Sequence, residues 1–226
     1  MPDRRKSVFT AVMGFVLGAA LIVTLPASAS YARSCKGYVG LTYDDGPESA
    51  TTMHLLEALD EHGLRATFFN TGRNSAAHPE LVRAQRDAGM WIGNHSYSHA
   101  HMTELSKSEM ASQIRRTQRV IKQITGTAPE LFRPPWGETN ATVKEVAAGF
   151  GLTEVLWDID SRDWAGASAD EIVKAAGELR DGEVIVMHED DWDTIDAVPR
   201  IAEDLRARGL CSGMISTSTG SAVAPD

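Results

Sequence analysis

Residues 38–47, with the sequence Y-V-G-L-T-Y-D-D-G-P, join an apolar, β-branched run to two adjacent carboxylates and a Gly-Pro pair. The run at 38–43 predicts a buried strand, and the Gly-Pro pair predicts a turn directly after it. Because neighbouring residues of an extended segment face in different directions, Asp44 and Asp45 can meet different partners. One carboxylate can then bind a metal ion while the other acts as a base. The alternative is a turn in which both acids bond only the local backbone.

Four further segments place polar side chains directly after a strand-like run. They are H-S-Y-S-H at 95–99, R-P-P-W-G at 133–137, D-S-R-D-W at 160–164, and V-I-V-M-H at 184–188, which ends in a histidine. In βα barrels the active site lies at the carboxyl ends of the strands and is built from the loops that follow them. The pattern therefore predicts one site assembled from five separate segments.

Strand-like and helix-like runs alternate along the chain. The predicted strands are 38–43, 65–70, 90–93, 131–132, 153–157, 183–187 and 213–215, and the predicted helices are 51–62, 79–88, 106–124, 140–148, 168–179 and 196–208. Seven strands with helices between them predict parallel βα units in a single α/β domain, which can close as a barrel or stay open and doubly wound. The residues after 216 are small and polar and are expected to form a loose tail.

The first 29 residues have the pattern of a secretory signal peptide. Arg4, Arg5 and Lys6 precede an apolar run at 8–25, and Ala-Ser-Ala at 27–29 is a small-residue cleavage site. The alternative is a retained anchor, because 18 apolar residues can just span a bilayer. Pro26 and the cleavage site favour a secreted, extracellular protein whose mature chain is 30–226, with its core at 37–215.

Net charge limits the partners of the mature chain. The full chain carries a formal charge of −9, and loss of the signal peptide, which has a net charge of +2, takes this value to −11. An acidic surface argues against nucleic acid and anionic membranes as partners, and it leaves neutral polysaccharides open. We expect a monomer that does not contact the membrane after the signal peptide is removed.

Cys35 and Cys211 are the two cysteines of the chain, one near the mature start and one near the end. In an exported protein this pair predicts a disulfide that ties the two ends of the fold together. The alternative is two separate buried thiols. No cysteine lies near the histidine segment, so a cysteine-based metal site is not expected.

His95 and His99 are spaced so that both imidazoles can bind one ion if their segment is helical or tightly turned. With one carboxylate they form a borderline-soft set, which suits zinc, cobalt or another divalent first-row ion better than calcium or magnesium. Three protein ligands leave room for water, whose pKa on zinc falls to ~7. A structural histidine pair is the alternative. His101 can also replace His99 as a ligand, although we place it on the rim.

The remaining segments supply an arginine, a carboxylate and a last histidine. Arg133 can pair with a carboxylate and hold it ionised and oriented, or it can form a surface salt bridge of little consequence. His188 is suited to proton transfer, because the ordinary pKa of a histidine side chain is ~6.5. Asp163 can hold the His188 imidazole in its productive tautomer.

The five segments, in this order, resemble the five motifs of the polysaccharide deacetylases (carbohydrate esterase family four, the NodB-homology domain). The resemblance covers 37–215. The sequence around the five motifs is similar to that of secreted bacterial acetylxylan esterases and chitin or chitooligosaccharide deacetylases. It implies a distorted (β/α) barrel with about seven strands and a metal-dependent hydrolase that removes acetyl groups from a polysaccharide or oligosaccharide. Peptidoglycan is an alternative substrate, and a non-catalytic carbohydrate-binding protein on the same scaffold is an alternative from another class.

Carried over residue by residue, the resemblance implies a role for each matched position. Its implied metal ligands are Asp45, His95 and His99; its implied catalytic residues are Asp44 as base, Arg133 as the tether of Asp44, His188 as acid and Asp163 as its orienting partner. The Trp136 N–H would help bind the oxyanion, and Trp164 would wall the acetyl pocket. Tyr43 and Trp136 depart from the phenylalanine and tyrosine that are commoner in the family, and the second departure puts the preferred sugar in doubt.

Overall fold

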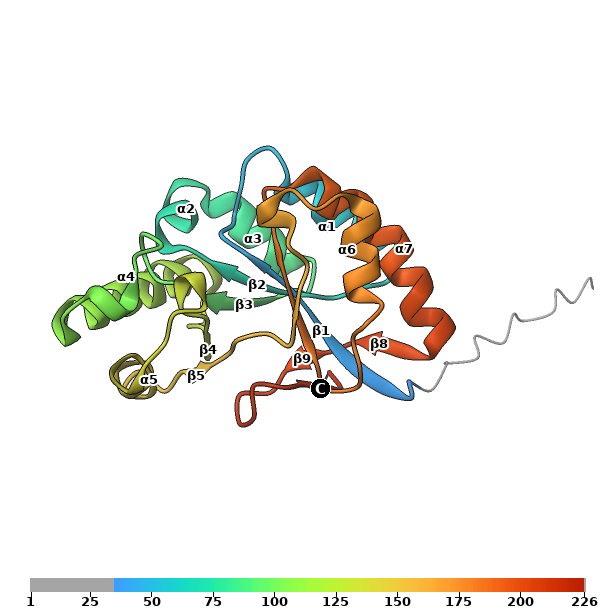
Figure 1. Ribbon diagram of the computed structural model, residues 1–226. Coiled ribbons are helices and arrows are strands. Elements are labelled where there is room, and N and C mark those ends of the chain that lie inside the picture. The colour runs from blue at the N-terminus through green and yellow to red at the C-terminus, as the bar shows by residue number, and fades with distance from the viewer. Residues whose placement is uncertain (1–34, 226) are drawn as a thin grey trace, which may run out of the picture. The chain divides into compact units, whose positions relative to one another are not determined.

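A curled parallel sheet organises the part of the chain that the computed structural model describes, residues 35–225 (Figure 1). Its strands follow the order β5-β4-β3-β2-β1-β7-β6, and β8 pairs in parallel with the first residues of β1. The bounds are β1 (Gly37–Asp44), β2 (Thr67–Asn70), β3 (Trp91–Asn94), β4 (Leu131–Phe132), β5 (Thr153–Glu154), β6 (Ile159–Asp160), β7 (Val184–His188) and β8 (Leu210–Ser212). The seven strands of the main path form a half-barrel that is open between β5 and β6, which confirms the predicted distorted (β/α) barrel in one domain.

Helices follow most of the strands and have well-defined ends. Their bounds are α1 (Thr52–Glu61), α2 (Gly72–Ala77), α3 (Pro79–Asp87), α4 (Lys107–Thr125), α5 (Ala141–Ala148), α6 (Ala169–Ala176) and α7 (Trp192–Arg208), with short 3-10 turns η1 (Met102–Glu104), η2 (Pro135–Gly137) and η3 (Asp163–Ala165). Capping boxes begin α4 and α6: the backbone N–H groups of Ser106 and Ser168 donate to Glu109 and Glu171. Such caps satisfy amide groups that the first helical turn leaves without partners.

The central strand β1 directs alternate side chains to two different cores. Leu41 and Tyr43 pack in the larger cluster, which lies between the sheet and the helices α1, α6 and α7 (Figure 1). Thr42 and Asp44 lie on the opposite face, because successive strand residues point to opposite sides. This alternation places polar groups of β1 inside the half-barrel at the end of the strand where the chemistry was predicted.

The C-terminal segment differs from its prediction in two ways. Residues 213–215 do not add a strand to the main sheet; β9 (Met214–Ile215) pairs antiparallel with β10 (Ala222–Val223). The tail beyond 216 is therefore not loose, and Ala222 is buried beside Ile215 in an apolar cluster. Burial of these few apolar side chains against the sheet outweighs the polar composition of the segment.

Two further boundaries differ from the sequence expectation. Asp160 lies in β6 itself and does not follow a strand at 153–157, because the chain leaves the sheet after Glu154 and pairs again with β7 at Ile159. Helix α7 begins at Trp192, earlier than the expected 196, because the Asp191 side chain accepts the backbone N–H of Asp193 and caps the helix there.

Cys35 and Cys211 form the predicted disulfide, with an S–S distance of 2.01 Å. The bond joins the residues just before β1 to β8, so it fastens the two ends of the fold to each other. Among residues 35–225, no helix is both long and apolar enough to cross a bilayer. The expected signal peptide at 1–29 lies outside the described residues.

Candidate metal centre

Strand register brings the predicted segments to one edge of the sheet. Asp44 ends β1 and lies opposite His188, which ends β7. His95 directly follows β3, and Arg133 directly follows β4. Because all of these strands are parallel, their carboxyl ends meet, and side chains from five separate segments face one cavity.

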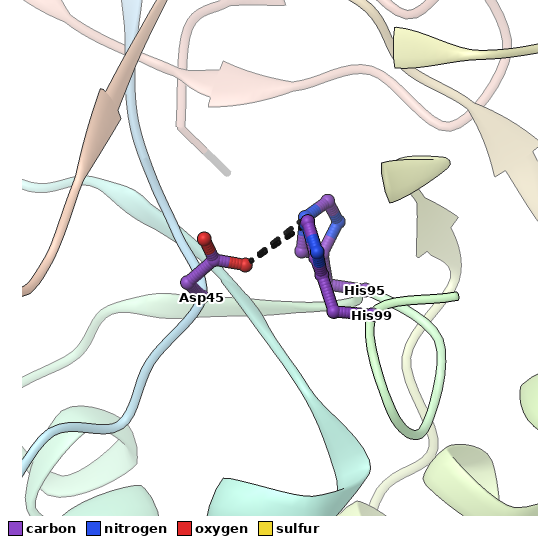
Figure 2. Close-up of side chains that lie close together, drawn as sticks. All are labelled: Asp45, His95 and His99. Carbon is purple, nitrogen blue, oxygen red and sulfur yellow. Dashed lines mark ion pairs between the residues drawn. The ribbon is translucent and has the colours of Figure 1, made fainter. Parts of the chain in front are cut away.

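Asp45, His95 and His99 form the group that can hold an ion (Figure 2). One atom from each lies within 4.8 Å of the others, and Asp45 Oδ1 lies 3.2 Å from His99 Nε2 and 3.5 Å from His95 Nε2. His95 Nδ1 donates to the Arg133 carbonyl at 2.8 Å, which leaves Nε2 as the nitrogen with a free lone pair. Burial lowers the pKa of both imidazoles, so it favours the neutral form that binds metals.

Asp45 Oδ1 itself indicates that the site is built for a cation. The atom is buried and has no hydrogen-bond partner in the described part of the chain. An unpaired buried carboxylate oxygen is costly, and here it faces the Nε2 atoms of two imidazoles. Two imidazole nitrogens and one carboxylate oxygen are ligands that suit a divalent first-row ion. The residues present therefore fit the metal that the sequence suggested.

The histidine segment is a tight turn, one of the two conformations considered from sequence. Ser96 and His99 have left-handed backbone angles, with φ of 61° and 55°. The Gln113 side chain on α4 accepts the N–H groups of Tyr97 and Ser98 at 2.8 and 2.9 Å, and thereby fixes the turn. Sequence reasoning missed this role of Gln113, because its partner lies in a different element. His101 lies on the rim, as expected, where its Nδ1 is 3.0 Å from Glu138.

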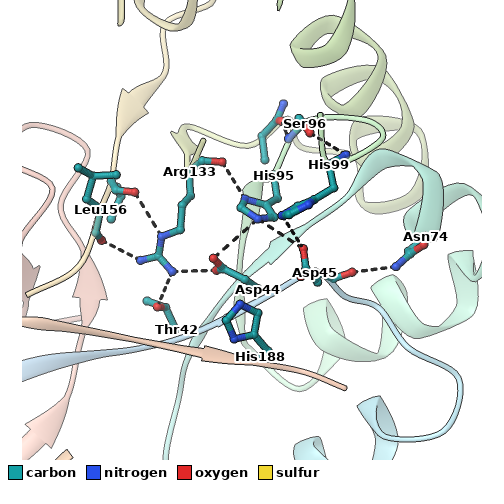
Figure 3. Close-up of polar contacts among 12 residues, drawn as sticks. Thr42, Asp44, Asp45, Asn74, His95, Ser96, His99, Arg133, Leu156 and His188 are labelled. Atoms are coloured by element: carbon teal, nitrogen blue, oxygen red, sulfur yellow. Dashed lines mark hydrogen bonds and ion pairs between the residues drawn. The ribbon is translucent and has the colours of Figure 1, made fainter. Parts of the chain in front are cut away.

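Asp44 faces away from Asp45 and toward Arg133 (Figure 3). Arg133 is fully buried, and its Nη1 donates to Asp44 Oδ1 at 2.8 Å and to Thr42 Oγ1 at 2.7 Å. Its other donors reach the carbonyl oxygens of Val155 and Leu156 at 3.2 and 2.9 Å. Arg133 therefore binds Asp44 and not Asp45, although both carboxylates also lie near His95 Nε2, and Arg133 is no surface salt bridge.

His188 is held by Asp163 on the other side of the cavity. The imidazole Nδ1 lies 2.8 Å from Asp163 Oδ1, and the His188 backbone N–H donates to Oδ2 at 2.6 Å. The Thr194 hydroxyl and the Trp164 backbone N–H also donate to this carboxylate, at 2.9 and 2.8 Å. Burial disfavours the charged imidazole, but the hydrogen bond and charge of Asp163 outweigh burial and raise the pKa of His188 to about 9.

These groups line one cavity of about 530 Å³. Its lining residues are Asp44, Asp45, His95, His99, Trp136, Trp157, Asp160, Trp164, Val186, His188, Asp190 and Asp191. Trp136 and Trp164 are 60% and 65% exposed and lie at its mouth. Trp136 packs edge-on against His99, with ring centroids 4.7 Å apart, and stacks on His101 at 5.1 Å.

The backbone is strained around this cavity. Within residues 35–225, five residues other than glycine have positive φ, and three of them line the cavity: they are Asp45, Ser96, His99, Trp136 and Arg162. Such conformations cost of order 1–3 kcal/mol each and persist where the surrounding structure enforces them. Asn74 supplies part of that restraint, since its side chain donates to the Asp45 carbonyl at 2.8 Å.

A buried carboxyl group behind the site was also missed from sequence. Glu189 is 1% exposed, and it accepts hydrogen bonds from the Thr52 hydroxyl and from Gln85 Nε2. A Cβ atom at Gly46 would lie 1.6 Å from Glu189 Oε2, so only glycine allows the turn after Asp45 to pass this close. The signal in the sequence was an acid directly after His188.

Known proteins resemble the chain in both sequence and structure. Residues 32–155 match the family model described as polysaccharide deacetylase. A bifunctional xylanase/xylan deacetylase of Cellvibrio japonicus is 44% identical over 194 residues, which cover 85% of this chain and 29% of that protein. A peptidoglycan-N-acetylglucosamine deacetylase of Bacillus cereus is 34% identical over 179 residues, which cover 77% of this chain and 65% of that protein.

A family 4 carbohydrate esterase from Streptomyces lividans, solved in complex with acetate, has a similar structure. Its TM-score is 0.84 at 58% sequence identity, and the match covers 85% of this chain and all of that one. The chain spans less than two thirds of the length of both curated relatives described above.

Proposed function

The chain belongs to the polysaccharide deacetylase family, and on that premise we propose that it is a metal-dependent hydrolase that removes acetyl groups from a polysaccharide or oligosaccharide. The observation that carries the proposal is one cavity with three converging metal donors, flanked by Asp44 on one side and His188 on the other. The acetate in the Streptomyces lividans esterase gives further support, because acetate is the product that this reaction releases.

In this proposal Asp45, His95 and His99 hold a divalent ion, with zinc or cobalt as the expected choices. Such an ion polarises an acyl carbonyl and lowers the pKa of water close to it. The paired imidazoles orient their Nε2 atoms toward Asp45, and the His95–Arg133 hydrogen bond keeps one of them fixed.

Asp44 would act as the general base. It accepts the proton of the water whose oxygen forms the new bond to the acetyl carbon. Arg133 holds one of its oxygens, and the other, Oδ2, lies 3.8 Å from His95 Nε2, on the side of the ion site. Arg133 thereby acts as a positioning residue, since it fixes the direction in which Asp44 presents its free oxygen.

His188 would act as the general acid. Its Nδ1 is engaged by Asp163, so Nε2–H is the proton available to the leaving group. When the bond between the acetyl carbon and the sugar nitrogen or oxygen breaks, this proton passes to the leaving atom and acetate is released. An amine leaves poorly unless it is protonated, so His188 matters more for N-acetyl than for O-acetyl substrates.

Trp136 and Trp164 would complete the pocket. The Trp136 backbone N–H would donate to the oxyanion that forms on the acetyl oxygen, and Trp164 would form the wall against the acetyl methyl group. The left-handed backbone of Trp136, with φ of 62°, sets the direction of this peptide at the cavity. Loss of one such donor typically costs ~3 kcal/mol of transition-state stabilisation.

The acetylated glycan is the open part of the proposal. Xylan O-acetyl groups and chitin or chitooligosaccharide N-acetyl groups are our preferred substrates, and peptidoglycan N-acetylglucosamine is the alternative suggested by the Bacillus cereus relative. A non-catalytic binding protein would have lost the base or the acid, and both Asp44 and His188 are present. The disulfide supports the proposed extracellular location, since such bonds persist in oxidising compartments.

One experiment tests the function and the substrate together. Acetate release is measured from acetylxylan, chitooligosaccharides and peptidoglycan, with metal-stripped protein and with added zinc or cobalt. We expect activity to depend on the metal and to be absent in Asp44→Asn. Full activity of the metal-stripped protein, or of Asp44→Asn, would contradict the proposed mechanism.

A further inference from the structure

Three tryptophans of the described chain are more than half exposed, and all three lie on the same side of the molecule as the cavity. Trp136 and Trp164 line it, and Trp192, which is 52% exposed, directly follows Asp190 and Asp191, which also line it. The indole of Trp192 has no place in the proposed mechanism. A large aromatic surface beside the opening of a catalytic cavity therefore has no assigned function.

Trp192 is held firmly at this position. It is the first residue of α7, where the Asp191 side chain caps the helix at 2.7 Å from the Asp193 nitrogen. The hydroxyl of Thr194 is bonded to the buried Asp163 carboxylate, which fixes the same helical turn to the site. The imidazole ring of His54 on α1 packs against the indole, with ring centroids 5.2 Å apart. The indole is thus a rigid surface that loses little freedom when a ligand covers it.

A sugar ring suits this surface better than a protein partner does. The apolar C–H face of a pyranose packs against an aromatic ring, while its hydroxyl groups bond acceptors at the ring edge. Asp190, which is exposed, lines the cavity two residues before Trp192 and provides such an acceptor. One indole is far smaller than a stable protein interface, which buries about 800 Å² on each partner. Trp192 is also the next residue in the chain after the cavity-lining Asp190 and Asp191.

We propose that Trp192, backed by His54, forms an outer saccharide subsite that binds a neutral pyranose unit of the glycan beyond the acetylated sugar. This inference rests on the proposed deacetylase function. A short substrate fills the cavity without reaching Trp192, whereas a longer chain covers the indole as well. Trp192 therefore contributes to selectivity for chain length and takes no part in the chemical step.

The test compares substrate lengths in the metal-loaded protein. The kcat/KM values for fully N-acetylated chitobiose and chitohexaose, or for acetylated xylo-oligosaccharides of two and six sugars, are measured in wild type, Trp192→Ala and Trp192→Phe. We expect Trp192→Ala to lower the hexamer-to-dimer ratio by about 3- to 10-fold, and Trp192→Phe to restore most of that ratio. Trp91→Ala is the matched control, because Trp91 begins β3 at the opposite end of the strand from the site. It should leave the ratio unchanged.

A binding measurement separates this inference from the proposed function. In the Asp44→Asn background, which is expected to be inactive, hexamer binding is measured by calorimetry with and without Trp192→Ala. Weaker hexamer binding without the indole supports the subsite even if no substrate is turned over by wild type. Equal hexamer binding in the two proteins, or an equal loss of kcat/KM for dimer and hexamer, would overturn it.

Discussion

The His188 imidazole and the Asp163 carboxylate are joined twice, once through the ring Nδ1 at 2.8 Å and once through the His188 backbone N–H at 2.6 Å. The double contact fixes both the position and the rotation of the ring. It also supplies the negative charge that keeps a largely buried imidazole protonated, with a pKa of about 9. Both the geometry and the charge of this pair are compatible with the proposed role of His188 as a proton donor.

Asp163→Asn is expected to shift the alkaline limit of activity to lower pH. An acid must be protonated to act, so activity falls as pH rises through its pKa. Without the Asp163 carboxylate, the charges of Asp44 and Asp45 are what still opposes burial, so the pKa of His188 falls. The kcat profile against pH should lose its alkaline activity at least about one pH unit earlier, and the loss should be larger for N-acetyl than for O-acetyl substrates. An unchanged profile would mean that His188 is not the acid.

Loss of the proposed base and loss of a proposed metal ligand are expected to have different effects. Asp44→Asn removes the proposed base and should lower kcat by about 10²–10⁴-fold while zinc affinity stays near the wild-type value. His95→Ala removes a proposed ligand and should abolish turnover and lower zinc affinity together. Zinc titration by calorimetry, beside acetate-release kinetics, distinguishes the two. Equal zinc affinity in His95→Ala and wild type would remove His95 from the ligand set.

Arg133→Met is expected to destabilise the fold more than Asp44→Asn does. Removing the arginine leaves a buried carboxylate and the carbonyl oxygens of Val155 and Leu156 without their donors. Removal of one partner from a buried ion pair typically costs about 3–5 kcal/mol of folding stability. Urea unfolding of both single variants and the double variant gives the coupling energy. The double variant should be more stable than Arg133→Met; strict additivity would contradict a direct interaction.

The sequence predicted the place of the site better than it predicted the outline of the fold. Asp45, His95 and His188 each follow or end a parallel strand, and parallel strands bring their carboxyl ends together whatever the loops do. Local signals also mark the ends of elements: Gly126, which directly follows α4, has a left-handed φ of 88°, a conformation that glycine favours at a helix C-terminus. These features depend on a few neighbouring residues, which a single sequence displays.

The features that sequence reasoning missed depend on distant partners. Gln113 holds the histidine turn, and Glu189 supports the turn after Asp45, but neither stands in a local pattern that marks this role. The hairpin of β9 and β10 forms because Ala222 is buried against the sheet, although the residues before it, 216–221, are small and mostly polar. Tertiary burial decided these cases, and composition gave no indication of it.

Loss of the disulfide is expected to lower stability without removing activity at moderate temperature. Cys35 and Cys211 lie 176 residues apart, and the chain-entropy model gives about 5 kcal/mol for a loop of this length. The double variant Cys35→Ala/Cys211→Ala should unfold at lower urea concentration, and the bond is remote from the cavity lining. Wild type under reducing conditions is the control and should behave like the variant. If the variant and the reduced wild type both unfolded at the same urea midpoint as the oxidised wild type, the disulfide would contribute nothing to stability.

Glu189→Gln is expected to stabilise the protein in neutral and mildly alkaline solution. Burial, opposed in part by the hydrogen bonds from Thr52 and Gln85, raises the pKa of Glu189 to about 8. Between its ordinary pKa and this value, the folded chain binds more protons than the unfolded chain, so the free energy of unfolding falls as pH rises through that window. Glutamine keeps the shape of the side chain and has no charge to bury.

The stability difference should therefore be small near pH ~4 and should grow to a few kcal/mol near pH ~8, with no further growth above that. Urea unfolding of metal-free protein across this range measures it. Glu178→Gln is the matched control: Glu178 is an exposed carboxylate, so its change should leave the pH dependence of wild type intact. A Glu189→Gln variant less stable than wild type at every pH would contradict this prediction. It would mean that the fold, including the turn after Asp45, requires the charge of Glu189.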